Sequence, residues 1–310
     1  MRTLTSIIAA ALLPFAAFAG TATVSGPGKD KAVQPVECTP NLMDEVIATT
    51  DYGFHQKMER GPGNIEVEHN DIELDRRIPL DFLGWPNVPC GQWCLRLGAD
   101  YERFDFSLHN APQLPDTLQS VSGVIALEYM VNNDAAFMIE TRPGVYFQQK
   151  INTGSFDAPT NIAMGYPIFG GDKFYLIAGV TVSALSAYPV LPIGGVLWHI
   201  NDKWDLRAYL PDPRLVYQCC SHFELWAGGE LVGGAYKTDN RIVKPETLSG
   251  TTVTYDEVRA GAGFTWKAKP LTIDFGAGYT IQSEFDYSRA VQNYSAHPAP
   301  YIRLTARLDF

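Results

Sequence analysis

The chain ends in Tyr301-Ile-Arg-Leu-Thr-Ala-Arg-Leu-Asp-Phe310, a stretch whose side chains alternate in character. The even-numbered residues from Ile302 to Phe310 are apolar, and the odd-numbered residues from Arg303 to Asp309 are polar. Because successive side chains of a strand point to opposite faces, this stretch predicts a strand with one apolar and one charged face. Such a strand is typical of a transmembrane β-barrel wall between lipid and water. A terminal strand of a soluble β-sandwich is the alternative that this stretch leaves open.

The N-terminus predicts export. Residues 1–19 combine a positive start at Arg2, a short apolar run and the small-residue pattern Ala17-Phe18-Ala19, which together indicate a secretory signal peptide. The apolar run is too short for a spanning helix, which needs roughly 20 residues. Residues 20–44 are rich in Gly, Pro and Lys without periodicity and are interpreted as a flexible periplasmic leader. The rest of the chain, residues 45–310, is assigned to the barrel.

The composition is consistent with an exported barrel. Only 46% of the residues are hydrophobic, as expected when each strand shows lipid half of its side chains. The 15 Tyr, 16 Phe and 6 Trp could form aromatic belts at two membrane interfaces. Trp198, Trp204, Trp226 and Trp266 lie near predicted strand ends and are assigned to these belts. The net charge of −10 argues against nucleic acid as a partner.

Alternating segments precede the C-terminal strand. Residues 257–267 and 271–282 each place large apolar side chains on one face, and Lys269-Pro270 joins them as a hairpin. Both segments reach the roughly 9–11 residues that a tilted strand needs to cross a bilayer. Weaker segments extend back to Glu45. The sequence therefore predicts an all-β fold, a transmembrane antiparallel up-and-down β-barrel of about 12 strands, with a range of about 10–14.

Two segments depart from simple alternation. In residues 92–109 the apolar positions change parity between Tyr101 and Phe104, and a β-bulge near Glu102-Arg103 would reconcile them. In residues 204–217, Pro211-Asp-Pro213 predicts a turn between two short strands, because proline cannot donate to a ladder. One bulged crossing strand is the alternative. The loops between the last strands are alternately short and long, as on the two sides of an outer-membrane barrel.

A family resemblance appears around this turn. Leu210-Pro-Asp-Pro-Arg-Leu-Val-Tyr217 and Glu224-Leu-Trp-Ala-Gly-Gly-Glu230 resemble an uncharacterised family of bacterial outer-membrane β-barrel proteins, a domain of unknown function. The likeness covers residues 191–310 best. The last residue, Phe310, resembles the final aromatic residue that serves bacterial outer-membrane barrels as an assembly signal. The resemblance implies the bacterial outer membrane as location, with its lipid and its assembly machinery as partners, and it implies no activity.

Charged side chains recur on the predicted inner faces of the strands. The lumen-facing candidates are Arg96, Asp100, Glu128, Glu140, Arg142, Glu224, Glu230, Glu257, Arg259, Asp274, Arg303 and Arg307. They could form Arg–carboxylate pairs that fill the lumen, or a constriction that selects solutes by charge. The glycines at 261, 263, 276 and 278 favour some open space, because they remove side-chain bulk from two adjacent strands.

No pattern of catalytic or metal chemistry stands out. None of the six histidines has metal-site spacing with another. Ser107 lies two residues from His109 on the same side of one predicted strand, which is not a hydrogen-bonded catalytic arrangement. We therefore expect no enzyme, no cofactor and no metal site. Among five cysteines, Cys90 and Cys94 are the expected disulfide, since they would close a small loop in the oxidising periplasm.

The predicted function is a passive outer-membrane channel for small polar solutes. A non-conducting barrel with a structural or loop-mediated binding role is one alternative. A soluble periplasmic β-sandwich is another. The sequence names neither a solute nor an oligomeric state.

Overall fold

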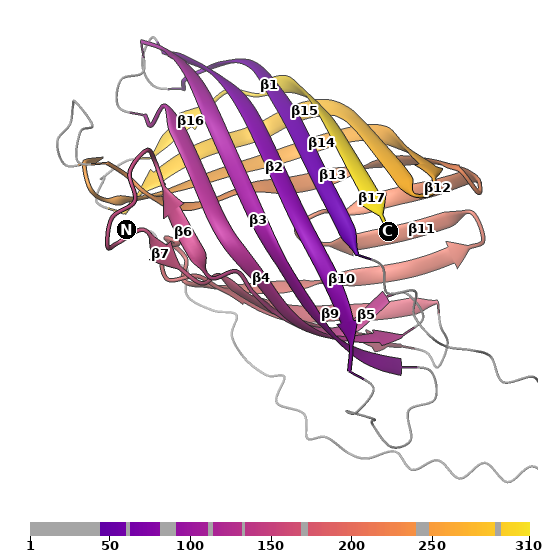
Figure 1. The fold of residues 1–310 in the computed structure, drawn as a ribbon. Helices are drawn as coiled ribbons and strands as arrows, with labels where there is room; N and C mark the ends of the chain where they lie inside the picture. Colours follow the sequence, from indigo (N-terminus) through magenta and orange to yellow (C-terminus); the bar gives the residue numbers. More distant parts are fainter. Residues whose placement is uncertain are drawn as a thin grey trace, which may run out of the picture. The chain divides into compact units, whose positions relative to one another are not determined.

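Fourteen antiparallel strands close on themselves into a barrel in the computed structural model of the chain (Figure 1). The structure describes residues 44–59, 63–80, 91–110, 114–131, 134–168, 173–239, 248–288 and 293–310. The predicted signal peptide and residues 20–43 of the predicted leader lie outside these ranges, and so does Cys90. Within the described ranges, no helix is long and apolar enough to cross a membrane.

Three of the strands are each interrupted once, so that 17 elements make 14 strands. The elements are β1 (Glu45–Lys57), β2 (Asn64–Pro79), β3 (Gly91–His109), β4 (Thr117–Val131), β5 (Asp134–Thr141), β6 (Gly144–Phe147), β7 (Phe156–Asp157), β8 (Thr160–Pro167), β9 (Phe174–Val182), β10 (Val190–Asn201), β11 (Trp204–Tyr209), β12 (Arg214–Cys220), β13 (Phe223–Lys237), β14 (Thr252–Ala268), β15 (Leu271–Tyr287), β16 (Tyr294–Ala296) and β17 (Ala299–Asp309). β6 continues β5 along β4, β7 leads into β8, and β16 leads into β17.

The C-terminal strand closes the barrel. β17 pairs with β1 from Asp309 opposite Glu45 to Tyr301 opposite Gly53. The backbone N–H of Asp44 donates to the Phe310 carbonyl at 3.0 Å, and the N–H of Phe310 donates back at 2.9 Å. We call this end of the barrel the terminal end. Because every barrel strand has two neighbours, the sandwich alternative is wrong.

The central prediction of about 12 strands was low by two. The difference lies in the weaker segments, since β8, β11 and β12 are all separate strands. The two-strand interpretation around Pro211-Asp212-Pro213 is confirmed, because these residues connect β11 to β12. The predicted alternation of loop length holds for the last strands. Short connections at 221–222 and 269–270 lie at the terminal end, and the longer 238–251 lies at the other.

The predicted β-bulge near Glu102-Arg103 is wrong. β3 pairs with β2 and β4 in unbroken register through this point. The apolar residues change face because the surroundings of the strand change. Leu97 and Tyr101 point outward and are exposed, whereas Phe104 and Phe106 point inward and are buried in a core.

That core fills the barrel end opposite the terminal end, which we call the capped end. Its members come from the far ends of the long strands and from two loops, and they are Met58, Ile65, Val67, Phe104, Phe106, Leu114, Leu118, Tyr146, Tyr236, Leu248, Val253, Tyr255, Phe285, Tyr287 and Ala296. Across the barrel, Lys237 of β13 pairs in parallel with Phe147 of β6. The Gln148 N–H also donates to the Lys237 carbonyl at 3.0 Å. This pairing closes the long strands around their own apolar core.

The wall is uneven in height because only some strands reach the cap. β2, β3, β14 and β15 are 16, 19, 17 and 17 residues long. β8, β9, β11 and β12 have 8, 9, 6 and 7 residues. We call β8–β12 the short-strand side.

Candidate functional site: the barrel lumen

The first cluster in the lumen is built around two arginines of β3 and the β5–β6 junction. The Arg96 guanidinium lies 2.7 Å from the Asp75 carboxylate and 2.9 Å from that of Glu128, and it also pairs with Glu73 and Glu140. Arg142 pairs with Glu140 at 2.8 Å, with Glu73 at 2.9 Å and with Asp100 at 3.5 Å. Two arginines therefore meet five carboxylates, and Arg77 adds a third guanidinium 3.4 Å from Glu128.

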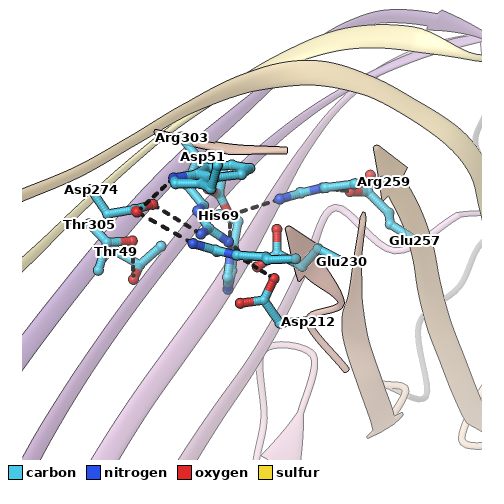
Figure 2. A network of polar contacts seen from close by, with 12 residues as sticks. Thr49, Asp51, His69, Asp212, Glu230, Glu257, Arg259, Asp274, Arg303 and Thr305 are labelled. Carbon is cyan, nitrogen blue, oxygen red and sulfur yellow. Dashed lines mark hydrogen bonds and ion pairs between the residues drawn. The ribbon is translucent and has the colours of Figure 1, made fainter. Parts of the chain in front are cut away.

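A second cluster surrounds Arg259 nearer to the cap (Figure 2). Its Nη1 lies 3.0 Å from Asp51 Oδ2, and its Nε lies 2.6 Å from Glu257 Oε2. The side chain of Arg259 is 1% exposed. Asp51 also accepts from His69 Nδ1 at 2.6 Å, and the Tyr255 hydroxyl donates to Glu257 at 2.5 Å. These contacts connect β1, β2 and β14 and bury the guanidinium.

Arg303 links the second cluster to β13 and β15, as Figure 2 shows. Its guanidinium pairs with Glu230 and lies 3.3 Å from Asp274 Oδ1. Asp274 also accepts from the Trp226 indole N–H at 2.9 Å and from the Thr265 hydroxyl at 2.6 Å. One carboxylate thus joins a charge pair, an indole and a hydroxyl.

The two remaining candidates lie near the terminal end. Glu224 pairs with Lys267 at 2.5 Å. Arg307 lies 3.5 Å from Glu45, and its side chain is 49% exposed. By strand register and contacts, the predicted candidates all lie on the inner face. The structure groups most of them into the two buried clusters and leaves Glu224 and Arg307 outside.

The inner-face glycines of β14 and β15 do not leave open space, contrary to prediction. A Cβ atom at Gly263 or Gly276 would lie 2.6 Å or 2.8 Å from the Trp226 indole. A Cβ at Gly261 would lie 2.7 Å from the Tyr301 hydroxyl. The missing side chains therefore make room for rings from neighbouring strands.

Trp226 is accordingly not an interface anchor. Its indole lies in the lumen against these glycines, and the Arg214 guanidinium lies 4.2 Å from its ring centroid. Trp198, Trp204 and Trp266 differ, because they point outward and are 42%, 38% and 42% exposed. The belt assignment remains a prediction for these three.

The inner face of the short-strand side is less tightly packed than the two clusters. Directly opposite residues of paired strands share a face of the sheet. Inward Glu140 is opposite Asn161, Asn161 is opposite Thr181, and Thr181 is opposite Leu191 of β10. Leu191 is therefore inward, and it is 49% exposed. Inward charged residues of the clusters, such as Glu140 at 5%, are buried. The inward residues of β8–β11 are half-buried or exposed throughout, whereas on β12 Val216 is 5% exposed and Arg214 belongs to the packed side.

A family model supports the assignment suggested by the sequence motifs. The model described as "Domain of unknown function (DUF6268)" matches residues 47–303. The chain belongs to this family. The predicted membership of an uncharacterised family is thereby confirmed, and the match also covers the N-terminal strands, where the resemblance was weak. A comparison with curated proteins found no match.

Solved barrels are similar in fold at low sequence identity. The COG4313 outer membrane channel from Pseudomonas putida F1 is 7% identical with a TM-score of 0.44, over 90% of this chain and all (100%) of that one. A TodX monoaromatic hydrocarbon channel mutant is 10% identical with a TM-score of 0.38, over 88% and 91% of the two chains. A mutant Rh. blastica porin is 10% identical with a TM-score of 0.30, over 86% and 99%.

The alternation of side chains in the sequence does not predict the role of several residues in the lumen. His69, Asp51 and Trp226 carry many of the contacts, yet only their partners across the barrel give them this role. Cys94 is buried, with its sulfur 3.7 Å from Glu128 Oε2, and because Cys90 lies outside the described ranges, the disulfide stays a prediction. Among the residues that the structure describes, no group of three or more His, Cys, Asp or Glu is arranged to hold a metal ion.

The close packing of the Trp226 indole on Gly276 predicts that substitutions at these two positions are coupled in their effect on stability. We expect Gly276→Ala to lower the free energy of unfolding by about 1–3 kcal/mol, because the new methyl group meets only the Trp226 ring. In a Trp226→Leu background the same change should cost much less. Chemical denaturation of the four proteins of this cycle measures the coupling. Gly123→Ala is the matched control, since its nearest atoms would be 3.9 Å away, and equal losses in both backgrounds would contradict the packing.

Proposed function

We propose that this protein is an integral outer-membrane barrel that lets small solutes pass along its short-strand side. The loosely packed inner face of β8–β11 beside a filled half is the observation that carries this proposal. The prediction of a channel for small polar solutes is thereby kept as a proposal, with a defined place for the path.

The outer surface supports a membrane location. Outward side chains such as Ile72, Leu74, Ile125 and Leu304 are 44–49% exposed. Apolar surface of this extent around a closed barrel is stable against lipid and costly against water. Nearer to the cap, outward positions carry Glu66, Glu68 and other polar side chains while the inner face becomes apolar. The long strands thus leave the bilayer and continue as a water-facing barrel.

Passage along β8–β12 can be tested by blocking it. In a cysteine-free background, Ala163→Cys places a thiol on the inner face of β8, since Ala163 pairs between inward Met138 and Gly179. We expect a charged methanethiosulfonate reagent to reduce the single-channel current of this variant in planar bilayers. Ile162→Cys, one residue away and outward-facing, is the control and should not respond. A correctly folded barrel without ion conductance would refute the channel.

Non-conduction is the second candidate, because the cap and the two clusters close so much of the lumen. In that case the same bilayer experiment would show folded protein and no current. A structural or loop-mediated role would then be the better proposal.

Phe310 remains the proposed assembly signal. Its side chain is 66% exposed on the outward face of the terminal end, where assembly factors and lipid could contact it. Deleting Phe310 should lower the fraction of protein that shows heat-modifiable gel mobility in outer-membrane fractions. Because its backbone bonds to Asp44 are also lost, Phe310→Ala is the cleaner variant, and an unchanged fraction in Phe310→Ala would exclude the signal.

A further inference from the structure

The inner surface of the short-strand side includes four aliphatic side chains. Ile177 of β9 and Leu191, Ile193 and Leu197 of β10 point inward and are exposed or half-buried. We call these four residues the apolar wall. The inner face of a water-filled barrel is ordinarily polar. The two charged clusters of this barrel follow that rule, and the apolar wall does not. Four aliphatic side chains facing open lumen cost free energy unless an apolar group covers them.

The apolar wall adjoins one unneutralised cation. Arg207 of β11 lies directly opposite Leu197 in the sheet and is therefore also inward. Its side chain is exposed, and the guanidinium has no ion-pair partner in the part of the chain that the structure describes.

A second guanidinium lies next to it. Arg214 of β12 is directly opposite Arg207 in the register. Arg214 is neutralised by Asp212 at 2.6 Å and by Asp274 at 3.4 Å. Of the two opposed guanidiniums, Arg207 is therefore the one that no carboxylate of the described ranges balances.

We propose that the passage takes amphipathic carboxylates, with the carboxylate at Arg207 and the aliphatic body along the apolar wall. An arginine fork matches the two oxygens of a carboxylate in bidentate geometry. The apolar wall lies toward the cap from Arg207, so the aliphatic body would extend in that direction. This inference rests on the proposed channel function and narrows its solute class.

The test uses the full mature chain refolded in planar bilayers, with conductance in KCl as the baseline. Hexanoate, acetate and hexylammonium are added in turn. We expect hexanoate to block the current at roughly tenfold lower concentration than acetate, since it alone combines the anion with an aliphatic chain. If hexylammonium blocked the current at the same or a lower concentration than hexanoate, the site would not prefer an anion, and the proposed carboxylate site would be wrong.

Two variants with matched controls locate the site. Arg207→Gln should weaken the hexanoate block about tenfold, whereas Arg76→Gln, an outward arginine with a 72% exposed side chain, should not. Ile193→Thr should weaken the block severalfold, whereas outward Ile162→Thr should not.

The outcomes separate the two proposals. Absence of any current refutes the channel itself. A current that hexanoate and acetate affect equally, or an Arg207→Gln channel that hexanoate blocks as it blocks the unaltered protein, overturns the amphipathic solute while leaving the channel intact.

Discussion

Replacing Arg259 with leucine is expected to lower the free energy of unfolding by about 3–5 kcal/mol. The guanidinium is 1% exposed and holds Asp51 and Glu257, whose side chains are 2% and 0% exposed. Without it, two carboxylates remain buried in the barrel with too little positive charge. Urea titration of the refolded barrel, followed by tryptophan fluorescence, measures the loss.

Two controls separate charge from packing. Arg307→Leu should cost no more than about 1 kcal/mol, because this arginine is half exposed and makes one 3.5 Å contact. Adding Asp51→Asn and Glu257→Gln to Arg259→Leu should recover much of the loss, since the two carboxylates that Arg259 paired with are then also neutral. If Arg259→Leu and Arg307→Leu were equally stable, the buried cluster would not support the fold.

Replacing Phe104 with alanine should cost about 3–5 kcal/mol and loosen the cap. Its side chain is fully buried, and its ring centroid lies 4.2 Å from that of His69 and 5.3 Å from that of Tyr255. The cavity would lie where the long strands close around their own core. The same urea titration gives the stability, and planar-bilayer recording should show larger or noisier currents if the cap limits the path.

The control for the cap is another phenylalanine near the same barrel end. Phe156 of β7 is 64% exposed, so Phe156→Ala should change stability by only about 0.5 kcal/mol. A Phe104→Ala protein as stable as Phe156→Ala would mean that the aromatic core contributes little.

The local alternation of side chains predicted much of this barrel. The strands at 257–267, 271–282 and 301–310 and their outward faces follow from period-2 patterning, because that pattern depends only on neighbours along the chain. The turn at Pro211-Asp212-Pro213 also follows from local chemistry, since proline cannot donate to a ladder. For the same reason the inward placement of the charged candidates was accessible from the sequence.

Local patterning failed where the surroundings of a strand changed along its length. The parity change between Tyr101 and Phe104 predicts a bulge, yet β3 is regular. Sequence alone does not show that the outward positions become polar and the inward ones apolar at this height. The capping pair Lys237 and Phe147 joins residues 90 positions apart, which no local signal indicates.

The sequence by itself determined a barrel wall: which residues form strands, which face is apolar and where the last strand ends. The tertiary structure decided what fills the barrel. Arg259 meets Asp51 across 208 positions of the chain, and Trp226 occupies the space that glycines on β14 and β15 vacate. Strand patterns arise from adjacent residues, whereas lumen contacts arise only when distant strands are brought around one axis and their inner side chains compete for the same volume.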